Sequence, residues 1–415
     1  MMARFFYTML LYLLLPRTLA HLWSRAQKQP AYREHWDERF GRYRIKAGAP
    51  LVWVHAVSVG ETRAAAPLIA ELQRRYPGHR ILLTHMTPTG RETGESLFGD
   101  RVARCYLPYD FPFAVKRFLD HFKPACGIVL ETEIWPNLIH ACHRRRIPIY
   151  LVNARMSEKS RRGYARFKGF VAACLRELTG IASQSSADAQ RLQSLGAPAV
   201  VATGNLKFDI APDAALIARG RSWREAWGTS RPVLLCASTR EGEEALLLPR
   251  LRELALSDLL VVIVPRHPQR FDEVAQLFVR SGIAFQRRSA NEPIAAATRV
   301  LLGDSMGEMF AYYAASDVAI IGGSLLPFGA QNLIEACAAG CPVVVGPHVY
   351  NFAEAVELAR ETGAAVQAQD AESAVDAALA ILKDADRRRA MSEAGLKFAR
   401  DHRGAAARIA DLVNF

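Results

Sequence analysis

Short apolar runs alternate with longer amphipathic stretches along this chain of 415 residues. Such alternation is typical of α/β proteins, in which a buried parallel strand is followed by a helix. The first series of apolar runs, each a predicted strand, covers residues 51–57, 80–86, 126–131, 148–154, 180–184 and 199–204. A second series follows at residues 232–238, 259–265, 299–304, 317–324 and 342–346. The pattern therefore predicts two α/β domains, each built on a parallel sheet.

The segment between the two series is polar, charged and contains proline, which is typical of a linker. We predict a first domain over residues 25–207, a linker with one short helix over 208–230, and a second domain over 231–383. A helical tail over 384–415 could pack back on the first domain. In open α/β sheets ligands bind outside the carboxyl ends of the strands, so we expect two domains that face a central cleft.

The N-terminal segment is strongly apolar. Residues 5–15 are all apolar or aromatic except for Thr8. Pro16 and Arg17 interrupt this apolar run. The whole stretch from Phe5 to Trp23 is barely long enough to span a bilayer. Basic residues follow it, namely Arg25, Lys28, Arg33, Arg39, Arg42, Arg44 and Lys46. We interpret residues 1–24 as an uncleaved anchor or monotopic helix whose basic flank keeps the protein body cytoplasmic. An ordinary buried first helix and a cleaved signal peptide are the alternatives, although no clear cleavage site follows.

The net charge of +12 is unevenly distributed. Residues 1–207 contain 31 basic and 15 acidic residues, a balance of +16, whereas residues 208–415 contain 22 and 26, a balance of −4. A basic first half indicates an anionic partner, for which nucleic acid and anionic membrane are the usual classes. The apolar N-terminus favours the membrane, and the chain has neither a nucleic-acid-binding module nor basic residues interleaved with aromatic ones.

The cysteines and histidines do not predict a metal site. The seven cysteines include no C-x-x-C pair, which fits free thiols in a reducing compartment. The one literal D-x-D, Asp384 to Asp386, lies in the charged helical tail. His55 lies within a predicted strand, where a core position is the simplest interpretation. We therefore predict neither a metal nor a cofactor.

Glu61 follows the first predicted strand in the sequence "LVWVHAVSVGE". "SVGE" fits the capping box S-x-x-E, in which the acid returns a hydrogen bond to its own helix N-terminus. Alternatively, Glu61 is a general base, kept mostly ionised by the helix dipole and approached by a ligand over Gly60. The spacing alone does not separate the two interpretations.

Other acidic and basic residues also follow predicted strands. Glu131 and Glu133 end the strand before "IWPNL" and lie on one side of it if the strand continues. Lys207 lies at the domain boundary, where a cation could meet a leaving phosphate. Arg266 and His267 stand between two prolines after a fully apolar strand, and the guanidinium fork of arginine suits phosphate. A solvated turn is the alternative for each of these segments.

Residues 317–346 form the most informative stretch. A strand, a Gly-Gly-Ser turn, a helix and a new strand make one βαβ unit, although the dinucleotide fingerprint G-x-G-x-x-G is absent. Backbone amides at the glycine turn and at the helix start can hold a phosphate. Asn332 and Glu335 lie on one face of that helix, where a carboxylate suits a ribose diol. A surface acid favoured by the helix dipole is the alternative for Glu335.

Six segments together resemble the bacterial 3-deoxy-D-manno-octulosonic acid (Kdo) transferases of lipopolysaccharide assembly. They are "HAVSVGE", "ETEIWPN", "NARMSEKS", "TGNLKFD", "PRHPQRF" and "GGSLLPFGAQNLIEACAAGCPVVVGP". The resemblance extends from the N-terminal anchor to about residue 360. It implies a GT-B glycosyltransferase, with two Rossmann-like domains and no bound metal.

The resemblance also implies a reaction and a set of site residues. CMP-Kdo is the implied donor, bound mainly by the second domain, and the lipid A precursor at the inner membrane is the implied acceptor. Glu61 matches the family's proton acceptor, and Glu131 and Lys207 match positions that stabilise the transition state. The segments that match CMP contacts comprise Arg266, His267, Met306, Gly307, Glu308, Asn332, Leu333, Ile334 and Glu335.

Three other hypotheses fit parts of the sequence. A nucleotide-sugar epimerase or another GT-B enzyme would share the architecture, but a soluble epimerase does not need the apolar N-terminus. A non-enzymatic nucleic-acid-binding protein fits the basic charge of the first half but not the acidic second half. A membrane scaffold without catalysis would not need Glu61, Glu131 and Lys207.

Overall fold

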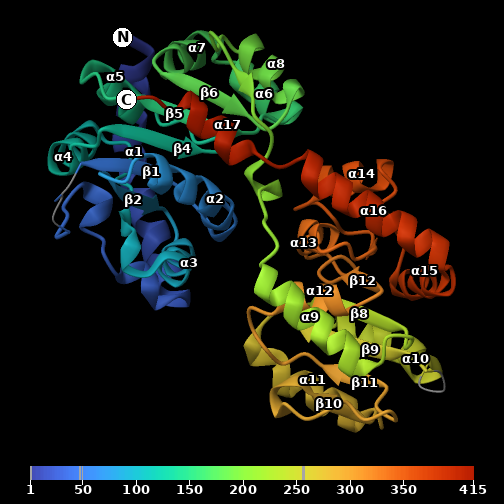
Figure 1. Ribbon diagram of the computed structural model, residues 1–415. Helices are drawn as coiled ribbons and strands as arrows, with labels where there is room; N and C mark the ends of the chain where they lie inside the picture. The colour runs from blue at the N-terminus through green and yellow to red at the C-terminus, as the bar shows by residue number, and fades with distance from the viewer. Residues whose placement is uncertain (1, 46–47, 49, 255–257) are drawn as a thin grey trace. The chain divides into compact units, whose positions relative to one another are not determined.

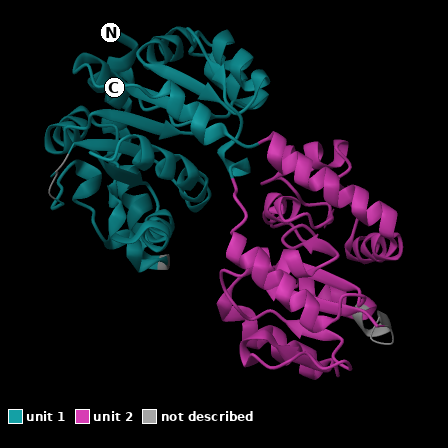
Figure 2. Ribbon diagram, in the orientation of Figure 1, with its two compact units in different colours: residues 1–209, 403–415 teal, residues 210–402 magenta. Residues whose placement is uncertain are grey.

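The computed structural model describes residues 2–45, 48, 50–254 and 258–415 (Figure 1). The chain forms two compact units, coloured separately in Figure 2. Unit one comprises Met1–Asp209 together with Arg403–Phe415, and unit two comprises Ile210–His402. Lys46, one of the basic residues after the apolar N-terminus, lies outside the described residues.

Unit one contains a parallel sheet of seven strands in the order β3-β2-β1-β4-β5-β6-β7. The strands are β1 Leu51–His55, β2 Arg80–His85, β3 Ala103–Tyr106, β4 Cys126–Leu130, β5 Ile149–Ala154, β6 Gly180–Ser183 and β7 Val201–Ala202. The order is that of a doubly wound Rossmann sheet, with its topological switch point between β1 and β4. The prediction of a strand in each of the six apolar runs of the first half is confirmed.

Helices cover both faces of this sheet. They are α2 Val59–Arg75, α3 Pro88–Phe98, α4 Pro112–Phe122, α5 Pro136–Arg144, α6 Glu158–Ala165, α7 Lys168–Arg176, α8 Ser186–Ser194 and α17 Ala405–Leu412, with short 3₁₀ turns η1 Pro30–Arg33, η2 Glu38–Phe40, η3 Gly99–Arg101 and η4 Leu206–Phe208. All five residues of β1 are buried, as expected for a parallel strand covered on both sides. Trp53 fills one face and lies against Gly127 of β4, where an added Cβ would lie 2.6 Å from the indole ring. The core thus fixes β1 beside β4 at the switch point.

The segment after residue 402 completes unit one. Asp209 accepts hydrogen bonds from the backbone N–H groups of Gly404, Ala405 and Ala406, and it thereby satisfies the free amides at the start of α17. Helix α17, red in Figure 1, packs against α2 and β6. Two segments almost 200 residues apart in the sequence are therefore held together by one carboxylate.

Unit two repeats the architecture with a parallel sheet in the order β10-β11-β9-β8-β12-β13-β14. Its strands are β8 Val233–Thr239, β9 Leu260–Pro265, β10 Phe285–Arg287, β11 Val300–Leu302, β12 Val318–Ile321, β13 Val343–Val345 and β14 Ala365–Gln367. Its helices are α9 Ala214–Trp227, α10 Glu243–Leu254, α11 Phe271–Arg280, α12 Met309–Ala315, α13 Leu333–Ala338, α14 Ala353–Glu361, α15 Ala371–Lys383 and α16 Ala385–Asp401, with 3₁₀ turns η5 Pro268–Arg270 and η6 Arg288–Ala290. The five strands predicted in the second half are all present, and the prediction of two Rossmann-like domains is confirmed.

Two helices outside the sheet connections of unit two pack closely on it. Helix α9 lies on α12, and Gly220 makes this approach possible because an added Cβ would lie 2.3 Å from the carbonyl oxygen of Ala311. Helix α16 packs against α13, with Gly395 beside Cys337. Residues 214–227, part of the predicted linker, therefore contribute to the packing of unit two.

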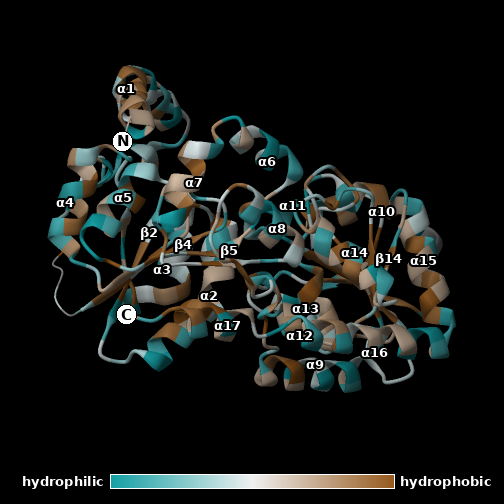
Figure 3. Ribbon diagram, turned by 90° about the horizontal axis from the view of Figure 1, so that it is seen from above, coloured by the Kyte–Doolittle hydropathy of each residue, from teal (hydrophilic) through white to brown (hydrophobic). Residues whose placement is uncertain are grey.

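The apolar N-terminus forms one long helix, α1 Met2–Lys28, which contains Pro16. Hydrophobic residues run along it in Figure 3. The helix is long and apolar enough to cross a membrane, and only 6% of its most apolar window is buried. The predicted N-terminal apolar helix is therefore present.

Candidate functional site

Glu61 lies in the first turn of α2, directly beyond the carboxyl end of β1. Its side chain folds back, so that Oε2 accepts a hydrogen bond from the Val57 N–H at 2.8 Å and Oε1 accepts one from the Ser58 hydroxyl at 2.9 Å. This is not a capping box, because the Ser58 side chain does not cap the helix amides and Glu61 accepts from the N–H of Val57 rather than from that of Ser58. A carboxylate has about four lone-pair positions, so two remain for another donor.

The environment of Glu61 disfavours its charged form. The pKa of Glu61 is raised to about 7, mainly by burial and in smaller part by the negative charges of Glu131 and Glu133, while the hydrogen bonds from Val57 and Ser58 partly oppose this shift. The helix dipole led us to expect a mostly ionised carboxylate, whereas burial shifts the pKa of Glu61 in the opposite direction. Burial outweighs the dipole here, and a pKa near neutrality suits a group that both accepts and releases a proton.

Glu131 and Glu133 follow β4, the strand that pairs with β1. Glu131 has φ 60°, the left-handed conformation that non-glycine residues rarely adopt, and its N–H donates to the Val152 carbonyl at 2.9 Å. Burial also raises the pKa of Glu133, whose carboxylate accepts a hydrogen bond from the Trp135 indole at 2.9 Å. The structure thus gathers three carboxylates at the switch point of unit one, where open α/β sheets bind ligands.

A network of buried amides positions Lys207. Asn153 accepts a hydrogen bond from the Leu206 N–H at 3.0 Å, Gln184 accepts one from the Asn205 side chain at 3.0 Å, and Asn205 accepts one from the Lys207 N–H at 3.0 Å. The turn η4 that carries Lys207 packs against α2, the helix that begins with Glu61. This network could not be predicted from the sequence, because Asn153, Gln184 and Asn205 are far apart along the chain.

The glycine turn of unit two is already occupied by an internal carboxylate. Glu243, fully buried at the start of α10, accepts hydrogen bonds from the N–H groups of Gly323 at 2.7 Å, Leu325 at 2.9 Å and Leu326 at 3.3 Å. It also accepts one from the Arg240 N–H at 2.8 Å. The expectation that the amides of this turn hold a phosphate is therefore wrong, because Glu243 already satisfies them.

Cationic side chains gather where β8 and β9 end. The Arg266 guanidinium donates to the Gln331 side chain at 3.1 Å, and the Arg240 guanidinium lies 4.3 Å from the centre of the Phe328 ring. Burial lowers the pKa of His267, and the neighbouring charges of Arg240 and Arg266 lower it further. A third arginine, Arg270, is neutralised by a bidentate pair with buried Glu244, at 2.7 and 2.9 Å. Arg240, Arg266 and neutral His267 form an arrangement suited to an anion.

The remaining predicted residues of unit two surround the same sheet edge. Met306 is exposed, Gly307 has φ 77°, and the Glu308 carboxylate accepts hydrogen bonds from Arg219 at 2.8 Å and Arg288 at 3.3 Å. The side chain of Glu308 is therefore held internally.

The four predicted residues at the start of α13, Asn332 to Glu335, differ in whether their side chains are buried. Asn332 caps the helix through the Ile334 N–H at 3.0 Å and donates to the Glu335 carboxylate at 3.1 Å. The side chains of Leu333 and Ile334 are buried in the core. Any contact of these two residues with a ligand must therefore use their backbone groups.

Histidines and cysteines occupy structural positions. His55 is fully buried beside Thr84, with Nδ1 at 2.9 Å from the threonine hydroxyl, and burial lowers the pKa of His55 to about 3. The seven cysteines are buried free thiols. Within the described part of the chain, no group of three or more His, Cys, Asp or Glu side chains could hold a metal ion.

Comparison with known proteins identifies the family. Residues 34–210 match the family of 3-deoxy-D-manno-octulosonic-acid transferases (kdotransferases), and residues 284–398 match glycosyl transferases group 1. The 3-deoxy-D-manno-octulosonic acid transferase of Bordetella pertussis is 46% identical over 99% of both chains. That of Haemophilus influenzae is 38% identical over 99% of this chain and 98% of its own. The chain belongs to the Kdo transferase family.

Solved structures agree on the fold of this Kdo transferase. UDP-GlcNAc 2-epimerase from Neisseria meningitidis is similar with a TM-score of 0.57 and 16% identity, over 87% of this chain and 99% of its own. A glycosyltransferase from Rickettsia africae is similar with a TM-score of 0.56 and 14% identity, over 88% and 98%. The GT-B fold predicted from the sequence is confirmed.

The two family matches divide the predicted site residues of the Kdo transferase. Glu61, Glu131 and Lys207 fall within the kdotransferase match, and residues 306–335 fall within the second match. Arg266 and His267 lie between the two matched regions, so only the geometry around β9 supports a role for them in binding a ligand.

Proposed function

We propose that the chain transfers Kdo from CMP-Kdo to the lipid A precursor lipid IV-A, with inversion at the anomeric carbon and without a bound metal. The observation that carries the proposal is the position of Glu61 in a Kdo transferase chain. Its carboxylate lies at the switch point of unit one, next to two further carboxylates, with lone pairs left for a substrate hydroxyl.

The chemistry is a single displacement in which Glu61 acts as the general base. As the acceptor hydroxyl oxygen forms a bond to the anomeric carbon, its proton passes to the Glu61 carboxylate. The bond from that carbon to the phosphate oxygen breaks, and CMP leaves with the electron pair. The transition state resembles an oxocarbenium ion, which the negative charge of Glu131 stabilises, while the cation of Lys207 stabilises the leaving phosphate.

Unit two binds the donor in this proposal. Arg266 and the neutral His267 follow β9, and the guanidinium groups of Arg266 and Arg240 suit the single phosphate of CMP. Met306, Gly307 and Glu308 contribute backbone groups and exposed surface at the next strand end. Asn332 and Glu335 contribute side chains at α13, whereas Leu333 and Ile334 contribute only backbone groups.

The acceptor is a bisphosphorylated lipid, so the reaction belongs at a membrane surface. We place the protein at the cytoplasmic face of the bacterial inner membrane. The +16 balance of residues 1–207 supports an anionic membrane partner rather than nucleic acid, because the chain carries no nucleic-acid-binding module.

One experiment tests donor, acceptor and product together. Purified protein is incubated with CMP-Kdo and lipid IV-A, with and without a chelator, and the lipid product is weighed by mass spectrometry. We expect a mass increase of one or more Kdo units that is insensitive to the chelator. Absence of a Kdo-bearing lipid would overturn the proposal.

A pair of variants on one helix tests the base. Glu61→Ala should abolish the product while folding and CMP binding stay near normal. Glu71→Ala, which removes a carboxylate paired with Arg74 and Arg75 further along α2, is the matched control and should retain activity. Near-normal turnover by Glu61→Ala would exclude Glu61 as the base.

A further inference from the structure

Helix α1 presents a largely apolar surface to the outside, most of it in the first half of the helix. Among its outward residues, Phe5, Phe6, Met9, Leu10, Leu13 and Trp23 are each more than half exposed. Scattered exposed hydrophobic residues are normal on a protein surface, but a cluster of this size along one helix marks an interaction site. Aromatic and aliphatic residues on one helix face are typical of segments that enter a membrane interface.

The opposite face of α1 is attached to unit one near both ends. Near the start, the Tyr7 hydroxyl donates to Asp110 at 3.0 Å, and the side chains of Thr8 and Asn137 exchange hydrogen bonds at 3.1 and 3.2 Å. Near the end, Leu22 and Ala26 are buried in a small cluster with Tyr32. The less exposed positions between them recur every three or four residues, as expected for one helix face on a support.

This attachment decides the orientation of α1 in a bilayer. From residue 7 to residue 26 the helix rises about 28 Å at 1.5 Å per residue, which is close to the roughly 30 Å thickness of the hydrocarbon core. If α1 crossed the membrane upright, the surface of unit one beside it would lie in hydrocarbon. Beside the first turns of α1, unit one carries the charges of Lys116 and Arg145, which are strongly disfavoured in hydrocarbon.

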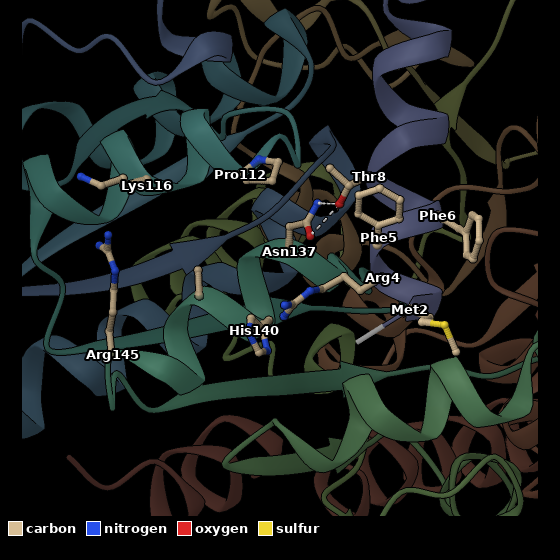
Figure 4. Close-up of a pocket in the computed structure, with 11 residues that line it drawn as sticks. Met2, Arg4, Phe5, Phe6, Thr8, Pro112, Lys116, Asn137, His140 and Arg145 are labelled. Atoms are coloured by element: carbon tan, nitrogen blue, oxygen red, sulfur yellow. Dashed lines mark hydrogen bonds between the residues drawn. The ribbon is translucent and has the colours of Figure 1, made fainter.

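A pocket opens beside the first turns of α1 (Figure 4). It has a volume of about 740 Å³ and is lined by α1, α4 and the region of α5. Arg4 and Phe5 come from α1, Pro112 and Lys116 from α4, and His140 and Arg145 from α5 and the residue after it. The walls are thus partly apolar and partly cationic.

The charge around the pocket is positive. Lys116 and Arg145 share a single carboxylate, Asp120, at 2.6 and 2.9 Å. An adjoining pocket of about 530 Å³ shares Lys116 and Arg145 and adds Lys123. Lys116, Lys123 and Arg145 therefore outnumber the Asp120 carboxylate that lies among them, and a phosphate group complements this excess charge.

We propose that α1 is monotopic: it lies along the surface of one leaflet with its exposed face inserted, and the pocket between α1, α4 and α5 holds the phosphate headgroup of an anionic glycerophospholipid. The inference rests on the membrane-surface part of the proposed function and not on the transfer reaction. Arg4, Lys116 and Arg145 bind the phosphate, and Phe5 and Pro112 contact the adjoining apolar part of the lipid.

Vesicle binding without any sugar substrate tests the pocket. Full-length protein is sedimented with vesicles of phosphatidylcholine alone or mixed with phosphatidylglycerol. Lys116→Glu with Arg145→Glu should weaken binding to the anionic vesicles about tenfold or more and leave binding to neutral vesicles unchanged. Lys397→Glu with Arg400→Glu, the same charge change on the exposed face of α16, is the control and should bind like the parent. Equal binding of the pocket variant and the control would overturn the headgroup site.

Site-directed labelling tests the orientation. The native cysteines are buried, so Ala3→Cys or Gln27→Cys supplies the single exposed thiol for a membrane-impermeant maleimide added outside sealed vesicles. A monotopic helix leaves both positions labelled from the side on which the protein was added. Protection of one position until detergent is added would show that α1 spans the bilayer, and self-association through α1 without vesicle binding would assign the face to a second copy.

Transfer in detergent separates this inference from the proposed function. With a detergent-dispersed acceptor, Lys116→Glu with Arg145→Glu should retain the parent's rate, because no bilayer is involved. A matching loss of rate in detergent would assign the pocket to the acceptor instead. If the parent protein transfers no Kdo, the proposed function fails while the vesicle measurements remain decisive.

Discussion

Glu131 raises the pKa of Glu61 from the neighbouring strand of the sheet. The two residues follow β1 and β4, which pair in parallel register on either side of the switch point. Burial of Glu61 is the main cause of its raised pKa, and like charges held at adjacent strand ends add to the effect. The fold itself therefore tunes this carboxylate toward neutrality.

The transfer rate should depend on pH through Glu61. Because the base must be ionised and its pKa is about 7, kcat/KM should rise with pH, with a midpoint near 7. Glu133→Gln removes one of the charges that raise this pKa, so its midpoint should move to lower pH. Glu92→Gln, on the exposed surface of α3, should leave the midpoint in place. A profile that is flat across neutrality would contradict the assignment.

The stability of the protein should depend on the same group. The folded-state pKa of Glu61 is above the ordinary value of 4.5, so protonation stabilises the folded state at low pH, and this contribution is lost as the pH rises through about 7. Glu61→Gln removes the ionisation while Gln can still accept from the Val57 N–H. Its free energy of unfolding relative to the parent should therefore increase from about pH 5 to about pH 8, by at most about 3 kcal/mol. Denaturant unfolding at several pH values measures this difference, and a constant difference would count against a raised pKa.

Glu243 should be essential for the order of unit two. Glu243→Ala leaves the N–H groups of Arg240, Gly323 and Leu325 without their acceptor in a buried site, which should cost about 3 kcal/mol or more. We expect a lower melting temperature and weaker CMP binding. Glu241→Ala, which breaks an exposed pair with Arg240, should change the melting temperature little. A Glu243→Ala protein with unchanged stability would show that the turn does not depend on this carboxylate.

Substitution of Arg266 should weaken the binding of CMP but not the binding of cytidine. Arg266→Ala should weaken CMP binding about ten- to a hundredfold because a charge-assisted contact to phosphate is lost, whereas cytidine, which lacks the phosphate, should bind equally to both proteins. Arg280→Ala, at the exposed end of α11, is the matched control. Calorimetric titration of each protein with both ligands measures the effect. An equal loss for the two ligands would place Arg266 away from the phosphate.

The central strands could be predicted from the sequence because parallel strands covered on both faces are continuous apolar runs. Three edge strands, β3, β10 and β14, were not predicted. They are three or four residues long and half-exposed in part, and β3 contains Arg104 within "ARCY". Such strands are recognised by their pairing with a neighbour rather than by their own pattern.

The candidate site was predictable only as far as residues next to strand ends. Glu61 and Glu131 each follow an apolar run, and α/β topology brings such positions together. Glu243 was missed because an acid in the first turn of a helix has an ordinary local explanation, and its partners lie about 80 residues further along the chain. The pKa of Glu61 could not be foreseen either, because burial depends on the packed structure.

The return of the chain to unit one has a consequence for biosynthesis. The residues that donate hydrogen bonds to Asp209 are synthesised only after the whole of unit two. The same C-terminal segment, Arg403–Phe415, also contributes Phe415, whose ring centre lies 4.5 Å from that of Tyr76. During synthesis, unit one therefore exposes the apolar surface that α17 later covers, until translation has passed residue 402. Prematurely terminated chains lack α17, so their exposed apolar surface makes them targets for chaperones and proteases rather than partly active enzymes.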